Sequence, residues 1–251
     1  MILISPAKSL ANPQDIAFAP QQMPFFEQET AQIVKKMQKL KPPTLKELMQ
    51  LSDALTQLNY QRYQQWNTEN IACPALFYFK GDVYQGLDAE TLNEKQLNYA
   101  ATNLRILSGL YGIMRPFDAM KAYRLEMGTT ISVGKAKNLY QFWQAKITKR
   151  LQEEMNVQNA TFGVNLASQE YAKVLDFKQI KQPFVSPVFK QYKNGVYKII
   201  SFSAKRARGL MARFILENEL KNIADLQAFN AENYRYSAEM SKSLQPVFLQ
   251  D

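Results

Sequence analysis

The chain has 251 residues, 46% of them hydrophobic and 12% aromatic, which is enough to bury a sizeable core. It contains no histidine and one cysteine, Cys73, so histidine-dependent catalytic triads, cysteine–histidine zinc sites and an internal disulfide are excluded. No apolar run reaches the roughly 18 residues that span a bilayer, and residues 1–10 are too short and too polar for a signal peptide. We therefore expect a cytoplasmic protein that makes no membrane contact.

The first third of the chain predicts strands and helices in alternation. An apolar run at residues 1–4 predicts a buried strand, and residues 9–24 predict a proline-rich surface loop. Helices are expected over residues 28–40, after Thr44 as a cap, and again from Ser52. The apolar stretch 74–79 predicts a second buried strand.

A helix-hairpin-helix-like element is expected over residues 104–120. A helix capped by Asn93 continues to Leu107, Gly109 and Gly112 form the turn, and Pro116 starts a short helix. Such an element can offer backbone N–H groups to a phosphate, although ordinary helix packing is the alternative. Four cations around the turn favour nucleic acid: Arg105, Arg115, Lys121 and Arg124.

The second half predicts a long helix over residues 139–155, a strand over 161–166, and a hairpin at Lys193-Asn194-Gly195. A short helix at 222–229 and a strand at 246–249 follow. No repeat or linker divides the chain, so we expect one α+β domain over residues 1–251.

The most informative stretch covers residues 198–216, where an apolar run ending at Phe202 predicts a strand and Ser203 is placed as the cap of a helix. Helical periodicity separates an apolar face, which includes Leu210 and Met211, from a basic face. Gly209 lies on the basic face and predicts close approach by another backbone, with a phosphate chain as a fitting partner. The basic face consists of Lys205, Arg206, Arg208 and Arg213.

The net charge of +9 is concentrated in this part of the sequence. Residues 177–216 contain nine Lys or Arg and no Asp or Glu, while the remaining 22 basic residues balance 22 acidic ones. A local basic surface for a polyanion is therefore favoured, with a merely solvated basic helix as the alternative.

Polar clusters follow several of the predicted strands, which is where binding and catalytic residues gather. These residues suggest an alternative function, an enzyme acting on a nucleobase or nucleotide. Without histidine, a lysine or carboxylate would have to transfer the proton. The catalytic candidates are Ser5, Lys8, Asp82 and Glu126, with Lys80 and Ser168 converging in the same pocket.

Short motifs spread over nearly the whole chain resemble the YaaA family of bacterial proteins. They comprise residues 4–8, 79–84, 107–112, 123–128, 139–143, 165–168, 201–202 and 204–211. The resemblance implies a cytoplasmic protein that protects cells and their DNA during hydrogen peroxide stress and is associated with lowered free iron. It also implies one α+β unit that binds DNA through a basic cleft with a helix-hairpin-helix, mapping onto residues 107–112 and 205–213.

We therefore predict a DNA-binding protein whose partner is duplex or locally unpaired DNA. The expected contacts are the basic face, the cations and glycines of residues 105–124, and Lys8 and Lys80. No cofactor or metal is expected, because iron sites draw on histidine, cysteine and clustered carboxylates. A regulator that acts through protein contacts is the third alternative.

Overall fold

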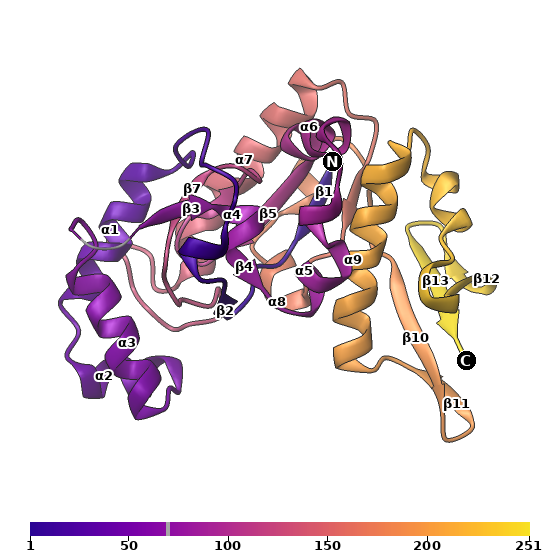
Figure 1. Cartoon of the computed structure of the whole chain (residues 1–251). Coiled ribbons are helices and arrows are strands. Elements are labelled where there is room, and N and C mark those ends of the chain that lie inside the picture. The colour runs from indigo at the N-terminus through magenta and orange to yellow at the C-terminus, as the bar shows by residue number, and fades with distance from the viewer. Residues whose placement is uncertain (69–70) are drawn as a thin grey trace.

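A mostly parallel sheet forms the centre of the structure, a computed structural model that describes residues 1–68 and 71–251 (Figure 1). Its strand order is β6-β5-β1-β8-β9, in which β5, β1, β8 and β9 run parallel and β6 is antiparallel to β5. The strands are β1 (Ile2–Ile4), β5 (Leu104–Ser108), β6 (Gly112–Met114), β8 (Gly163–Asn165) and β9 (Phe184–Val185). The predicted strands at residues 1–4 and 161–166 are confirmed.

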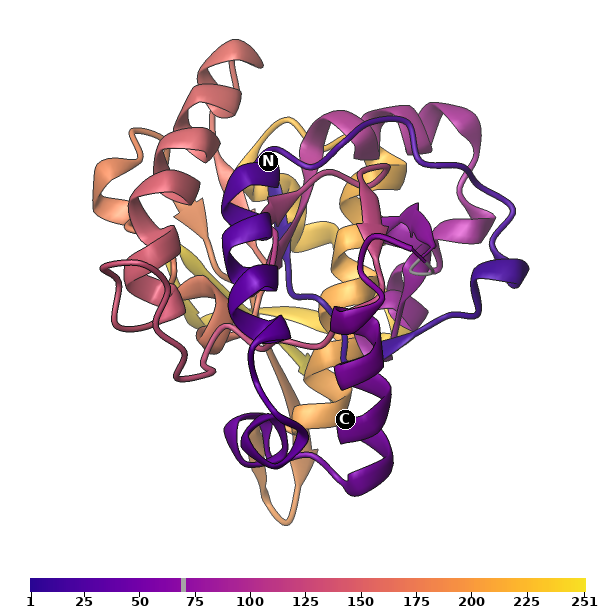
Figure 2. The ribbon, with the colours of Figure 1, turned by 90° about the vertical axis from the view of Figure 1, so that its left-hand side faces the viewer.

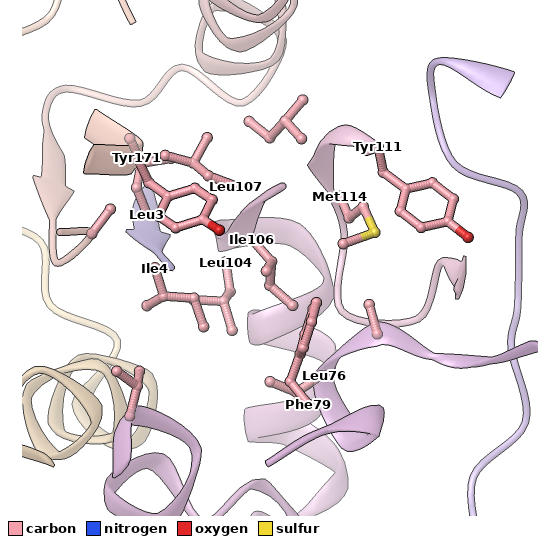
Figure 3. Packing of buried hydrophobic residues seen from close by; sticks show 14 of the residues in the cluster. Leu3, Ile4, Leu76, Phe79, Leu104, Ile106, Leu107, Tyr111, Met114 and Tyr171 are labelled. Atoms are coloured by element: carbon pink, nitrogen blue, oxygen red, sulfur yellow. The ribbon is translucent and has the colours of Figure 1, made fainter. Parts of the chain in front are cut away.

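The two central strands are buried along their whole length. Leu3 and Ile4 of β1 pack with Ile106 and Leu107 of β5, and all four are fully inaccessible to solvent (Figure 3). Strands covered on both faces read as continuous apolar runs, which is why residues 1–4 are recognisable in the sequence. The same core cluster extends into the C-terminal sheet through Phe248.

The helices that the periodicity predicted in residues 28–64 and 139–155 are present. Ser52 caps α3 as expected, accepting a hydrogen bond from the Leu55 amide, and Asn138 caps α7 through the Gln141 amide. Helix α2 begins at Pro42, so Thr44 lies inside it rather than at its cap. The long helices are α1 (Glu27–Gln38), α2 (Pro42–Met49), α3 (Asp53–Gln64), α6 (Glu94–Asn103), α7 (Leu139–Val157) and α9 (Ser201–Asn218).

A second, four-stranded sheet forms one end of the molecule, and α1–α3 form the opposite end (Figure 1). In the view turned by 90°, α1–α3 stand in front (Figure 2). Its order is β11-β10-β13-β12, from β10 (Val188–Lys193), β11 (Val196–Lys198), β12 (Arg235–Lys242) and β13 (Gln245–Gln250). Asn194 and Gly195 turn with φ of 56° and 82°, which confirms the predicted hairpin. The α+β class is thus confirmed. Among the described residues, no helix combines the length and apolar content required to cross a bilayer.

The helix-hairpin-helix prediction is wrong. Helix α6 ends at Asn103, and the following residues form the β5–β6 hairpin of the central sheet, with Ser108 paired to Gly112. Met120 lies in β7 (Ala119–Lys121), a strand paired with β3 (Ala72–Pro74), instead of in a second helix. The apolar residues from Leu104 onward continue a helical spacing, but pairing with β1 buries them on both faces of a sheet, and this tertiary contact decides their conformation.

The stretch 74–79 is also more broken than predicted. It comprises the end of β3, one helical turn, α4 (Ala75–Tyr78), and the start of β4 (Phe79–Lys80), which pairs with β2 (Ser9–Leu10). Further short elements are α5 (Asp82–Leu87), α8 (Gln169–Ala172) and five 3-10 turns: Pro13–Asp15, Ala89–Thr91, Phe177–Gln179, Ile223–Ala228 and Ala231–Asn233.

Two glycines bring α9 against α5. A Cβ on Gly209 would lie 1.9 Å from the Val83 carbonyl oxygen, and one on Gly86 would lie 2.3 Å from the Arg206 carbonyl oxygen. Close approach by another backbone at Gly209 is therefore confirmed, but the approaching chain is α5 rather than a phosphate chain. Helix α9 also starts earlier than predicted, with Ile200 as its cap and Ser203 in its first turn.

We predict that Gly209→Ala destabilises the protein. In an open helix this change would stabilise by about 1 kcal/mol, whereas forcing a methyl group into the α5 backbone should cost about 2 kcal/mol. Gly86→Ala should act in the same direction. Urea unfolding measures both, and an unchanged or increased unfolding free energy would contradict the backbone contact.

Candidate functional site

A cavity of about 460 Å³ opens at the carboxyl ends of β1 and β8. Ser5 follows β1 and Ser168 follows β8, and the Ser168 amide donates a hydrogen bond to Ser5 Oγ at 2.8 Å. In open parallel sheets, ligands bind at this edge. The volume lies within the range typical of small-molecule sites.

All six residues of the predicted pocket line this one cavity: Ser5, Lys8, Lys80, Asp82, Glu126 and Ser168. Of the predicted DNA contacts, Arg124, Lys205 and Arg208 line it as well. The side chains arrive from the exit of β1, the β4–α5 turn, residues 123–126, the exit of β8, and α9. The cavity thus joins the strand-end clusters to the basic helix.

Three buried tyrosines that the sequence reasoning did not select also line the cavity: Tyr84, Tyr123 and Tyr171. Tyr84 donates to the Ser5 carbonyl at 3.1 Å, and the Tyr123 hydroxyl lies 2.6 Å from Ser108 Oγ. Burial raises the pKa of all three phenols, so they stay neutral at physiological pH. The three tyrosines lie far apart in the sequence, so no local motif indicates that they share a site.

Glu126 and Glu170, two of the carboxylates that line the cavity, are held by protein groups. Glu126 accepts from Arg124 Nε at 3.1 Å and lies 3.7 Å from Lys8 Nζ. Glu170 Oε1 accepts from the Gly128 amide at 3.0 Å. These contacts fix two acceptor groups at the cavity, each with a second carboxylate oxygen that can accept a further hydrogen bond.

Three cations of the cavity differ in this respect. Lys80, Lys205 and Arg208 form no salt bridge with any residue in the described ranges 1–68 and 71–251. Lys80 and Lys205 are exposed, but Arg208 is partly buried, and desolvation lowers its pKa without an opposing carboxylate. The planar guanidinium group has the geometry to donate two parallel hydrogen bonds to a carboxylate or a phosphate.

The other two arginines of the predicted basic face have protein partners. Arg206 pairs with Glu232 at 2.6 Å. Arg213 pairs with Glu217 at 2.7 Å and donates to the carbonyl oxygen of Asp88 at the end of α5. Arg213 therefore fixes the end of α5, a role that helical periodicity alone does not reveal.

The residues of the predicted hairpin contact belong largely to the scaffold. Arg105 is 2% exposed and donates two hydrogen bonds to Glu154, which corrects its placement on a binding surface. Arg115 pairs with Asp118, and Lys121 donates to the Trp66 carbonyl. The two glycines also pack internally: Gly109 lies against the Leu125 carbonyl and Gly112 against the ring of Trp143.

No three His, Cys, Asp or Glu residues lie close enough to hold a metal ion within the part of the chain that the structure describes. Cys73 is buried and free.

Comparison with known proteins places the chain in a family. The family model described as peroxide stress protein YaaA matches residues 1–240. The chain belongs to the YaaA family. Its membership supports a role in peroxide stress.

Relatives of this family are similar over nearly their full length. A UPF0246 protein of Aliivibrio fischeri is 46% identical, covering 99% of this chain and 97% of its own length. A UPF0246 protein of Shewanella amazonensis is 47% identical, with 100% and 99% covered. One from Flavobacterium johnsoniae is 46% identical, with 98% of each chain covered.

The buried ion pair between Arg105 and Glu154 predicts how substitutions change the stability of this YaaA-family protein. Glu154→Gln should destabilise it by about 3–5 kcal/mol, because it leaves a buried guanidinium without its counter-ion. Glu153→Gln on the same helix is the matched control. Its partner Lys149 is 80% exposed, so the change should cost about 0.5 kcal/mol or less. Equal effects of the two substitutions in thermal unfolding would refute the assignment.

Proposed function

We propose that this YaaA-family protein binds DNA during peroxide stress, through the cavity and the face of α9 beside it. The observation that carries the proposal is the set of cations without counter-ions at one place: Lys80, Lys205 and Arg208. Protein–DNA affinity derives largely from such groups, which neutralise phosphates and release condensed counterions.

The surrounding charge supports a polymeric anion. Residues 177–216 include β9, β10, β11 and most of α9, and they contain no carboxylate side chain. Lys193 and Lys198 belong to this segment but lie outside the cavity lining, in the β10–β11 hairpin, which projects beyond α9 (Figure 1). A small anion would need only the cavity, whereas a longer basic surface suits a phosphate backbone.

Binding of this kind would shield DNA or mark damaged positions for repair. The lowered free iron that the family resemblance implies is proposed to follow indirectly. The chain has no histidine and one cysteine, so it offers few of the ligands that direct sequestration of iron would need.

The salt dependence of binding tests the proposal. The slope of log affinity against log salt is about −0.9 per neutralised phosphate, so replacing Lys80, Lys205 and Arg208 together by Gln should flatten it by roughly 2.7. The loss should be similar for unrelated duplex sequences, because phosphate contacts carry no base information. Fluorescence anisotropy across a salt series measures the slope.

A charge-matched control removes three lysines elsewhere. Lys35, Lys36 and Lys39 lie on or directly after α1, at the far end of the molecule, and are exposed (Figure 1). Their replacement by Gln should leave the slope unchanged. If both triple variants flatten the slope equally, binding reflects net charge alone and the proposed site fails.

The convergence of all six strand-end residues in one cavity favours a second candidate, an enzyme that acts on a nucleobase or nucleotide. Of the carboxylates that line the cavity, Asp82, at the first position of α5, and Glu170, which accepts from the Gly128 amide, form no ion pair within the described ranges. Under the binding function, Asp82→Asn should change DNA affinity by no more than a few-fold, because the amide loses a negative charge but keeps one acceptor oxygen, and peroxide survival should change only in step with that affinity. Loss of survival with folding and DNA affinity intact would instead favour the enzyme.

A further inference from the structure

Arg208 is a partly buried arginine of the cavity. Its side chain extends from α9 into the cavity lining, it is partly buried, and no acidic residue in the described ranges pairs with it. Withdrawing a guanidinium from water is costly unless hydrogen-bonded anions replace the lost hydration.

Arg105 provides an internal comparison. It is more deeply buried than Arg208, and the fold supplies both Glu154 oxygens and two backbone carbonyls as acceptors. At Arg105 the protein itself thus supplies the acceptors that a buried guanidinium needs. At Arg208 no residue of the described ranges 1–68 and 71–251 supplies such an acceptor, which leaves the guanidinium available to a ligand.

The neighbouring residues define the charge of that ligand. Lys205 precedes Arg208 by one helical turn, so both side chains leave the same face of α9 toward the cavity. The close packing of α5 on α9 at Gly86 and Gly209 holds this face beside the end of β4, which contributes Lys80. The guanidinium group of Arg208 and the ammonium groups of Lys205 and Lys80 surround one cavity, and together they are suited to bind a phosphate.

The same cavity also contains groups that a bare phosphate would not need. Asp82, Glu126 and Glu170 offer acceptors, and the buried rings of Tyr84, Tyr123 and Tyr171 offer apolar surface with neutral hydroxyls. Carboxylates repel a phosphate but accept hydrogen bonds from the amino and imino groups of a base. A ligand with a phosphate at one end and such donors at the other matches both sets.

We propose that the cavity binds a single nucleotide unit, with its phosphate on Arg208, Lys205 and Lys80 and its base toward the carboxylates and tyrosines. The inference deepens the proposed function, because an unpaired nucleotide of bound DNA is one source of this unit. A free nucleoside monophosphate is the other source. An unpaired base costs least to extrude where the duplex is already damaged or mismatched, which suits a protein of peroxide stress.

Two binding measurements on the full chain test the inference. Calorimetry with each deoxynucleoside 5′-monophosphate, its nucleoside and inorganic phosphate tests the free source. Anisotropy with a fully paired duplex and the same duplex carrying one bulged nucleotide tests the polymer source. Arg208→Gln should weaken mononucleotide binding at least tenfold. If the unit comes from DNA, the same change should instead remove the preference for the bulged over the fully paired duplex.

Two further variants control the result. Arg235→Gln removes the same charge from the C-terminal sheet, where Arg235 pairs with Asp251, and should change neither measurement. Lys205→Gln alters an exposed side chain and carries little risk to folding, so a smaller loss of several-fold is expected even if Arg208→Gln proves unstable.

The outcomes separate the two proposals. Absence of both mononucleotide binding and a bulge preference would overturn the inference while leaving salt-dependent DNA binding intact. Inorganic phosphate binding as tightly as the nucleotides would also overturn it, because the base would then contribute nothing. If the wild-type chain binds nucleotides but binds no DNA, the proposed function is rejected and the cavity remains a site for free nucleotides.

Discussion

The close contact between α5 and α9 is the constraint on which the candidate site depends. Gly86 and Gly209 let the two backbones touch, since a methyl group at either position would overlap a carbonyl oxygen of the other helix. Residues about 120 positions apart in sequence thereby share one cavity, with Asp82 from α5 and Arg208 from α9. Arg213 strengthens the arrangement by donating to the Asp88 carbonyl at the end of α5. Gly209 thus helps to position the neighbouring cations of α9 by allowing α5 to approach, and no contact between Gly209 and a ligand is needed.

Ion pairs within the protein distinguish the basic residues that stabilise the fold from those that are left to bind a ligand. Arg105 has Glu154, Arg115 has Asp118, and the other arginines of the hairpin region and α9 are similarly engaged, Arg208 excepted. The cations that line the cavity without an ion pair come from the end of β4 and from α9, and they meet at the carboxyl edge of a parallel sheet. Net charge alone therefore overstates the binding surface, because most of the arginines that the sequence offered for DNA already neutralise a carboxylate of the protein.

The sequence predicted those parts of the structure that local chemistry determines. The Asn194–Gly195 turn, the Ser52 cap, the apolar strand at residues 1–4 and the amphipathic α9 all follow from neighbouring residues. It did not predict β5, because Leu104 to Ser108 continue the apolar spacing of α6 and only pairing with β1 makes them a strand. The strand-end polar clusters identified the cavity, whereas the tyrosines and the Arg105–Glu154 pair depend on long-range contacts that no local pattern encodes.

Site-specific photocross-linking tests most directly whether DNA lies over the cavity, as proposed. Ser9 is exposed and lines the cavity, while Val157 is 83% exposed at the end of α7 and lies outside the lining. A photoreactive amino acid placed at Ser9 should cross-link duplex DNA, and the same group at Val157 should give little product under identical salt. Equal yields from both positions, or a product from Val157 alone, would contradict the account.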